Sequence, residues 1–356
     1  MAPVIAELRS RPDQFGAYTC ATAQHRDMLD QVLGVFGISP EYDLDLMRAN
    51  QSLTGIVSGV LGGLETVIAE LKPDVILAQG DTTTTFAACL AGAMHRIKVG
   101  HVEAGLRTYD RSSPFPEEMN RRMASVVADW HFAPTDVARD NLLREQIPED
   151  DILVSGNTVI DALLIAAAQS IAEDAPPFDQ LDADKRLIVV TAHRRESFGP
   201  AFEGMCNAIR QIVARNDDVE VVYPVHPNPN VREPVHRLLA GDARIHLIEP
   251  LPYLEFVHVL KRSYLILTDS GGVQEEAPSL GVPVLVMRDT TERPEGVDAG
   301  TSKLIGTEPI RILSEVQRLL DTVDAREAMT NSVNPYGDGR SAQRIADFLR
   351  SRWVSG

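Results

Sequence analysis

The chain has 356 residues and a mass of 39.0 kDa, which exceeds what one compact core usually holds, so we expect two domains. Its 34 basic and 51 acidic residues give a net charge of 34 − 51 = −17, which argues against nucleic acid or an anionic membrane as a partner. Three widely spaced cysteines fit a reducing cytoplasm better than a disulfide framework or a zinc site. We expect no membrane span, because no apolar run approaches roughly 20 residues, and no signal peptide.

Short runs rich in Val, Ile and Leu alternate with amphipathic segments along the chain, which predicts an α/β fold with parallel sheets. The near-continuous apolar character of these runs indicates strands that are buried on both faces. We expect strands at 74–78, 98–102, 187–191, 219–223, 264–268 and 282–286. We expect helices at 1–8, 53–71, 158–172 and 341–353.

An acidic, Pro-containing stretch at 173–179 separates two halves of the chain. We therefore expect an N-terminal domain over 1–157, a C-terminal domain over 158–340 and a terminal helix over 341–356. In open parallel sheets, ligands bind beyond the carboxyl ends of the strands. Polar clusters at those places are the candidate sites.

Three carboxylates of the first half lie at such places. Asp81 follows a strand in a Gly-Asp-Thr-Thr turn, and it is either a functional group or, like the threonines, a cap for the next helix. Glu103 follows the strand at 98–102 and is either a general base or an ion-pair partner of Arg107. Glu117 opens a helix, where acidic residues are usually partners of the helix dipole.

The second half has its own clusters. His193 is flanked by two arginines at a strand end, which suits an anion site or a proton carrier, although a lone histidine there is more often structural. The Ser270-Gly271-Gly272 turn at a helix start presents backbone N–H groups that suit a phosphate. Glu276 lies on that helix, where a carboxylate can accept hydrogen bonds from the hydroxyl pair of a ribose.

Several common motifs are absent from the sequence. It contains no Walker motif and no Gly-x-Gly-x-x-Gly stretch, which weighs against an ATPase or a dinucleotide-dependent dehydrogenase. It also lacks the Cys–His and Gly-x-Ser-x-Gly nucleophile patterns. His226 lies in a Pro-rich loop, and the sequence does not decide which way it faces.

The polar motifs occur at 23–26, 80–85, 101–108, 193–197, 270–278, 288–295 and 334–339. As a set they resemble the motifs of the bacterial non-hydrolysing UDP-N-acetylglucosamine 2-epimerases. They keep the order of that family and extend over nearly the whole chain, so the set is specific although each motif alone is not.

The resemblance implies a GT-B architecture, in which two Rossmann-like domains with parallel sheets face a central cleft and the C-terminal helix crosses back to the first domain. It implies an isomerase that interconverts UDP-N-acetylglucosamine and UDP-N-acetylmannosamine for cell-surface polysaccharide synthesis. UDP is eliminated to leave 2-acetamidoglucal, and it adds back after C2 is reprotonated on the opposite face. The resemblance further implies a homodimer and no nicotinamide or metal cofactor.

The resemblance also implies roles for individual residues. Abstraction of a weakly acidic C2 hydrogen requires a positioned base, and a departing UDP requires cations and N–H donors. The implied catalytic residues are Asp81, Glu103, Glu117 and His193. The implied UDP-binding residues are Ser270, Gly271, Gly272, Glu276, Arg293 and Phe256. A possible allosteric site for a second UDP-N-acetylglucosamine comprises Gln24 and His25.

One feature of the family pattern is missing from the sequence. Members begin with a strand and a Gly-Thr-Arg-Pro-Glu loop, whereas this sequence begins at the Met-Ala-Pro that follows them. We therefore expect either a natural product that starts upstream of Met1 or a short form with reduced activity. The alternatives are a catalytically impaired nucleotide-sugar-binding protein, a GT-B glycosyltransferase, which the three carboxylates disfavour, and a hydrolysing epimerase.

Overall fold

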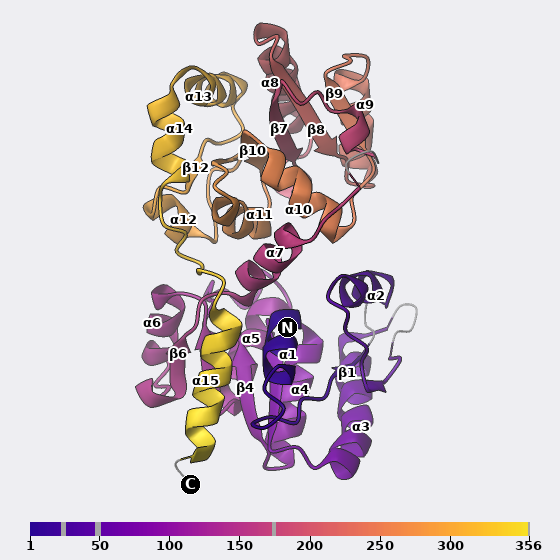
Figure 1. The fold of residues 1–356 in the computed structure, drawn as a ribbon, viewed down its shortest axis with the longest axis vertical. Coiled ribbons are helices and arrows are strands. Elements are labelled where there is room, and N and C mark those ends of the chain that lie inside the picture. Colours follow the sequence, from indigo (N-terminus) through magenta and orange to yellow (C-terminus); the bar gives the residue numbers. More distant parts are fainter. Residues whose placement is uncertain (23–25, 47–50, 173–175, 355–356) are drawn as a thin grey trace. The chain divides into compact units, whose positions relative to one another are not determined.

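The computed structural model describes residues 1–22, 26–46, 51–172 and 176–354. Internal contacts divide the chain into two compact units (Figure 1). Unit 1 comprises Met1–Ala162 and Tyr336–Gly356, and unit 2 comprises Leu163–Pro335. The division by contacts thus falls after residues 162 and 335, whereas the sequence suggested boundaries after 157 and 340.

Unit 1 is built around a parallel sheet with the strand order β3-β4-β5-β6. Its strands are β3 (Val75–Gln79), β4 (Lys98–Val102), β5 (Trp130–Ala133) and β6 (Ile152–Val154). All of β5 and most of β4 are buried, as parallel strands covered on both faces require. A separate short parallel pair is formed by β1 (Cys20–Ala21) and β2 (Tyr42–Asp43).

Helices connect and cover these strands. The helices that begin in unit 1 are α1 (Ala2–Arg9), α2 (Arg26–Val35), α3 (Leu53–Leu71), α4 (Thr83–Met94), α5 (Glu117–Val127), α6 (Asp136–Arg144), α7 (Thr158–Ala168) and α15 (Ser341–Val354). A 3₁₀ turn at Glu149–Asp151 leads into β6. The loops from β3 into α4 and from β4 into α5 carry two of the expected functional motifs.

Helix α3 has the bounds that the sequence predicted. Ser52 caps it by accepting the N–H of Gly55 at 3.1 Å, and Lys72 ends it in the left-handed conformation with φ of 49°. Among the described helices, α3 alone is long and apolar enough by composition to cross a membrane. Part of its apolar side, including Val60, packs against Ala87 of α4. A helix that covers a protein core in this way can have the same length and apolar composition as a membrane-spanning helix.

Helix α15 belongs to unit 1 although it follows unit 2 in the sequence. Ile345 and Leu349 are buried in one cluster with Trp130 and Phe132 of β5. The rings of Phe132 and Phe348 meet edge to face with centroids 5.4 Å apart. The return of the C-terminal helix to the first domain is therefore confirmed.

The carboxylate of Asp161, in α7, caps the N-terminus of α15. It accepts the backbone N–H groups of Ser341 and Ala342 at 3.2 and 2.8 Å. The first N–H groups of a helix have no partner within the helix, so this buried side chain supplies one from another element.

Unit 2 contains a parallel sheet with the strand order β12-β11-β10-β7-β8-β9. Its strands are β7 (Arg186–Thr191), β8 (Val219–Pro224), β9 (Ile245–Ile248), β10 (Leu265–Thr268), β11 (Val284–Val286) and β12 (Ser302–Leu304). Numbered from the start of the unit, this is the doubly wound Rossmann order, and it reverses direction between β7 and β10.

Apolar side chains of these strands alternate between two cores. Ile188 and Val190 pack into one cluster, and Leu187 and Val189 pack into another on the opposite face. The helices are α8 (Pro200–Arg215), α9 (Pro229–Leu239), α10 (Tyr253–Arg262), α11 (Gly271–Glu276), α12 (Pro294–Asp298), α13 (Pro309–Asp321) and α14 (Val323–Thr330). Short 3₁₀ turns lie at Phe178–Gln180, Arg195–Ser197 and Ala277–Leu280.

The six predicted strands are all present, with ends that differ from the prediction by at most two residues. Helix α7 ends at Ala168, earlier than the predicted residue 172. Strands β1, β2, β5, β6, β9 and β12 were not predicted, and each has only two to four residues. In β5, β9 and β12 a histidine or lysine also interrupts the apolar pattern.

Candidate functional site

In unit 2, the candidate residues gather where the strand order reverses. Strands β7 and β10 are neighbours, with Thr191 paired to Thr268 at their carboxyl ends. The loop with His193 follows β7, and the turn with Ser270 follows β10. Ligand sites of doubly wound sheets lie at this switch point. The topology therefore places two motifs, 77 residues apart in sequence, at one place.

Asp269 holds the loop of His193 in place. This carboxylate is fully buried, and its Oδ2 accepts the backbone N–H groups of His193 and Arg194, each at 2.7 Å. Its Oδ1 lies 3.6 Å from the Nδ1 of His193. A carboxylate in this position can orient an imidazole and stabilise its protonated form. Asp269 was not among the site residues expected from the sequence, although it stands next to the Ser-Gly-Gly turn.

The imidazole of His193 also has a second ring beside it. His226 stacks on it with centroids 5.3 Å apart and planes inclined by 13°. Burial lowers the pKa of His193; Asp269 acts against this, while His226 and Arg194 act with it. The lowered pKa favours the neutral imidazole at pH 7, and His226 faces it.

The turn after β10 leads directly into α11. A Cβ atom on Gly272 would lie 3.9 Å from Oε2 of Glu276, so this carboxylate borders the glycine turn. Burial first, and the neighbouring Glu275 second, raise the pKa of Glu276 to about 7, against a hydrogen bond from Tyr253 that lowers it. Phe256 packs against the apolar cluster that contains Val273 of α11. Backbone N–H groups, a carboxylate and an aromatic ring are thus associated with one short helix.

Arginines around this turn already have acidic partners. Arg288 pairs with Glu196 at 2.6 Å and with Glu292 at 2.7 Å. Arg293 donates from Nε to Glu275 of α11. Carboxylates therefore hold these guanidinium groups in place before any anionic ligand binds. Direct binding of a ligand by Arg293 stays a prediction.

In unit 1, Asp81 and Glu103 follow neighbouring parallel strands. Gly80 has φ of +82° and donates its N–H to Val102 at 3.0 Å, so the two strand ends are tied together. A Cβ atom on Gly80 would lie 3.6 Å from Oε2 of Glu103. Glu103 itself has φ of +63°, which is unusual for a residue other than glycine and is common at functional sites.

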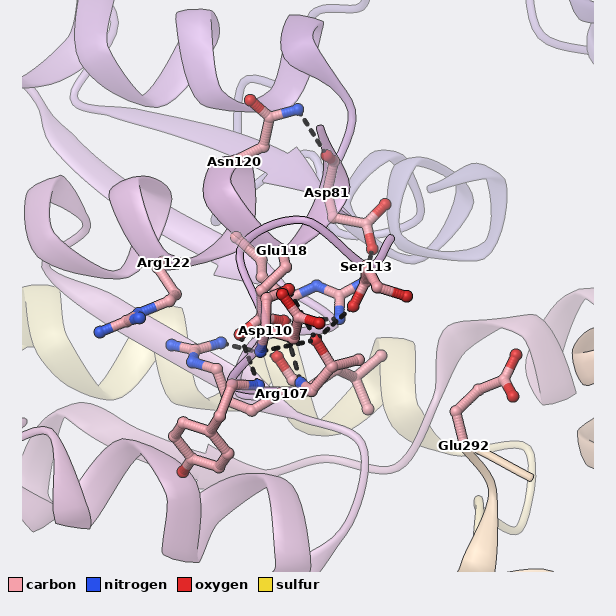
Figure 2. A network of polar contacts seen from close by, with 12 residues as sticks. Asp81, Arg107, Asp110, Ser113, Glu118, Asn120, Arg122 and Glu292 are labelled. Carbon is pink, nitrogen blue, oxygen red and sulfur yellow. Dashed lines mark hydrogen bonds and ion pairs between the residues drawn. The ribbon is translucent and has the colours of Figure 1, made fainter. Parts of the chain in front are cut away.

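Helix α5 supplies the third carboxylate. Among the described residues, Oε2 of Glu117 is buried without a hydrogen-bond partner. Its neighbours on the helix contact the Asp81 turn: Arg121 pairs with the Asp81 carboxylate, and Asn120 donates to the Asp81 carbonyl at 3.0 Å. Figure 2 shows this network around Glu118. The structure thus brings Asp81 and the first turns of α5 together.

The structure decides two alternatives from the sequence. Arg107 pairs with Glu145 at 2.7 Å, so the proposed pairing of Arg107 with Glu103 is wrong. A threonine does cap α4, as one alternative expected, because Thr82 accepts the N–H of Thr85 at 3.2 Å.

Two further predictions concern the possible allosteric site and metal binding. Gln24 and His25 lie outside the described residues. No group of three or more His, Cys, Asp or Glu within the described ranges is arranged to hold a metal ion.

The fold and these clusters define the class of the protein. It has two Rossmann-like units whose strand ends carry a glycine turn in one unit and carboxylates in the other. Such pairs of units are typical of the GT-B architecture, and the chain has this fold.

Comparison with known proteins gives the family. The sequence profile described as UDP-N-acetylglucosamine 2-epimerase matches residues 6–350. The chain is 55% identical to the UDP-N-acetylglucosamine 2-epimerase of Yersinia pestis over 361 aligned positions, which cover 100% of this chain and 96% of that protein. The chain belongs to the UDP-N-acetylglucosamine 2-epimerase family.

Solved structures agree with this membership. A structure titled as a UDP-N-acetylglucosamine 2-epimerase from Listeria monocytogenes superposes with a TM-score of 0.95 at 49% identity, covering 100% of this chain and 93% of that one. The enzyme from Neisseria meningitidis, bound to UDP-GlcNAc, superposes with a TM-score of 0.88 at 48% identity, covering 99% and 96%. A glycosyltransferase with a TM-score of 0.64 and 12% identity shares the fold alone.

Proposed function

We propose that this protein interconverts UDP-N-acetylglucosamine and UDP-N-acetylmannosamine. Family membership over nearly the whole chain supports the reaction, and the related Neisseria meningitidis enzyme binds UDP-GlcNAc. The observation that carries the proposal is the set of carboxylates in unit 1. Asp81 and Glu103 follow adjacent strands, and Glu117 opens the helix whose next turn holds Asp81.

Unit 2 has the groups needed to bind UDP. Backbone N–H groups at Gly271 and Gly272 suit the diphosphate, because a helix start favours anions. Glu276 suits the ribose hydroxyls once it is ionised, and Phe256 offers an apolar surface to the uracil. Ser270 and Arg293 complete the proposed set of UDP ligands.

Unit 1 supplies the acid and base for the sugar. A base removes the C2 proton, the electron pair forms a C1=C2 double bond, and the C1–O bond breaks so that UDP leaves with its electrons. An acid then protonates C2 on the other face, and a UDP oxygen re-forms the bond to C1. Asp81, Glu103 and Glu117 are the proposed acid and base groups.

His193 is the proposed partner of the leaving diphosphate. Its lowered pKa favours the neutral imidazole at pH 7, which can donate an N–H hydrogen bond to the diphosphate oxygen that gains negative charge as the C1–O bond breaks. Asp269, whose Oδ1 lies 3.6 Å from Nδ1 of His193, would help to orient the ring for this contact.

Proton NMR of the protein with UDP-N-acetylglucosamine in deuterated water tests the reaction. We expect UDP-N-acetylmannosamine with deuterium at C2, because the abstracted proton exchanges with solvent. Free N-acetylmannosamine with UDP would instead indicate a hydrolysing enzyme. A folded protein that binds UDP without turnover would indicate a nucleotide-sugar-binding protein and contradict the proposal.

The biological setting extends the same proposal. We infer that the reaction serves cell-surface polysaccharide synthesis in the cytoplasm and that the protein works as a homodimer. The low cysteine content and the family membership support this setting. Light scattering after gel filtration would measure the oligomeric state, and a mass near 39 kDa would contradict the dimer.

A further inference from the structure

The second residue of helix α5, Glu118, is a fully buried carboxylate with an unusual set of partners. It accepts the backbone N–H groups of Thr108 and Tyr109, each at 3.0 Å. Both residues belong to the loop that follows β4 and begins at Glu103. Glu118 therefore anchors this loop to α5 instead of interacting with the start of its own helix.

One turn further along α5, Arg121 connects this anchor to Asp81. Its Nη1 donates to Oε2 of Glu118 at 3.1 Å, and its Nη2 pairs with the Asp81 carboxylate. The adjacent Asn120 donates to the main-chain carbonyl of Asp81 at 3.0 Å. Asp81 is thus held at both its carboxylate and its backbone by consecutive residues of one helix (Figure 2).

The exposure of the three charged groups rises along this chain of contacts. The side chain of Glu118 is 0% exposed, that of Arg121 is 11% exposed and that of Asp81 is 29% exposed. Two carboxylates share one guanidinium, so the charges sum to −2 + 1 = −1. The buried carboxylate fixes the arginine, and the arginine fixes a carboxylate that still reaches solvent.

We propose that Arg121 is a positioning residue for Asp81 and that Glu118 is the anchor through which Arg121 is held. This inference rests on the proposed function, because it assigns Asp81 to proton transfer at C2. A planar guanidinium contacts two carboxylates at once through its fork of N–H groups, which a single ammonium reproduces poorly. Positioned groups matter for rate, since a shift of about 1 Å can cost a hundredfold in turnover.

The test compares Arg121→Lys with Arg122→Lys. Lysine at 121 keeps a positive charge beside buried Glu118, so the protein is expected to fold, but it releases Asp81. Arg122 is the next residue, its side chain is 42% exposed, and its contact with Glu145 is 3.9 Å long, which makes it a matched control. We expect Arg121→Lys to lower kcat by about a hundredfold with KM and UDP affinity unchanged, and Arg122→Lys to match the wild type.

Two results would overturn the proposal. One is a wild-type kcat in Arg121→Lys, and the other is a joint loss of kcat, UDP affinity and melting temperature, as general disorder would produce. Should Arg121→Lys fail to fold, the double variant Glu118→Gln/Arg121→Gln removes both charges together, leaves no unpaired buried charge and is measured in the same way.

A second readout does not depend on turnover. In protein labelled with ¹⁵N-arginine, the Nε resonance of Arg121 is assigned by its loss in Arg121→Lys. We expect this resonance to shift in Asp81→Asn, whereas that of Arg122 stays in place; an unmoved Arg121 resonance would overturn the proposal. If the wild type shows no epimerisation, the proposed function fails while this measurement still decides whether Arg121 holds Asp81.

Discussion

Glu276 is deeply buried, yet it is proposed to accept hydrogen bonds from the ribose hydroxyls as an ionised carboxylate. Burial raises its pKa to about 7, so roughly half of the free protein carries this carboxyl in protonated form at pH 7. A hydroxyl pair that donates to the carboxylate favours the ionised form. We therefore expect UDP binding at pH 7 to release on the order of half a proton from this group.

Calorimetry in buffers of different ionisation enthalpy measures that release. The phosphate of UDP also titrates, so the wild type is compared with Glu276→Gln, which lacks the carboxyl but keeps a similar shape. Equal proton release in the two proteins would show that Glu276 does not change its ionisation on binding. We also expect the affinity of the wild type for UDP to fall as the pH drops below about 7.

Gly105 is the residue of the loop after β4 that tolerates a side chain least. It has φ of +92°, and a Cβ atom would lie 2.2 Å from the backbone oxygen of Ala138. Gly105→Ala must therefore displace either this loop or α6, and we expect a loss of more than about 2 kcal/mol in unfolding free energy. Urea denaturation measures the loss.

Gly62 provides the matched control for that substitution. It lies inside helix α3, and no atom would come within 4 Å of its Cβ. Gly62→Ala should stabilise the protein by up to about 1 kcal/mol, because alanine is the better helix former. If the two variants had the same effect, crowding at Gly105 would not be the cause.

At the scale of elements, the pairing of β4 with β5 places two buried histidines opposite each other. Burial lowers the pKa of His101 from 6.5 to about 4 and that of His131 from 6.5 to about 3. Between pH 6.5 and 4 the unfolded chain thus binds more protons than the folded chain, so stability falls as the pH falls. For His101 we expect a loss of about 3 kcal/mol between pH 7 and pH 4.

Carboxyl groups titrate in the same range, so the histidine contribution needs its own control. His131→Gln removes one of the two titrating rings, and urea denaturation at pH 7 and pH 4.5 compares its pH dependence with that of the wild type. We expect the variant to lose less stability on acidification. An unchanged pH dependence would mean that His131 is not neutral in the folded protein at pH 4.5.

At the scale of the whole molecule, the stability of unit 1 depends on α15, the C-terminal helix of the chain. Ile345 of α15 is fully buried against β5, whereas Ile310 of α13 is 83% exposed. We expect Ile345→Ala to lower the unfolding free energy by 2–5 kcal/mol, roughly the range for buried large-to-small changes, and Ile310→Ala to change it by under about 0.5 kcal/mol.

Hydrogen exchange locates the effect of that change. We expect faster exchange of the β5 amides in Ile345→Ala, because Trp130 and Phe132 pack in the same cluster. Faster exchange confined to α13 and α14 of unit 2 would contradict this assignment of α15 to unit 1.

The sequence predicted the elements whose pattern is local. Apolar runs long enough to be buried on both faces marked β4 and β7, and apolar residues at helical spacing marked α3. Strands β5 and β12 are short, and a histidine or lysine interrupts the apolar run in each of them, so neither was recognised as a strand. They became strands because the sheet offered a hydrogen-bonding edge, which depends on the rest of the fold.

The candidate site divides in the same way. By itself, the sequence determined the α/β class, the family and the carboxylates that the motifs mark, since these depend on residue types and their spacing. Only the tertiary structure decided that Arg121 meets Asp81, 40 residues away, and that Asp269 holds the loop of His193, 76 residues away. A charged side chain has several possible partners along a sequence, and it is the packing of strands and helices that brings one of them within hydrogen-bonding distance.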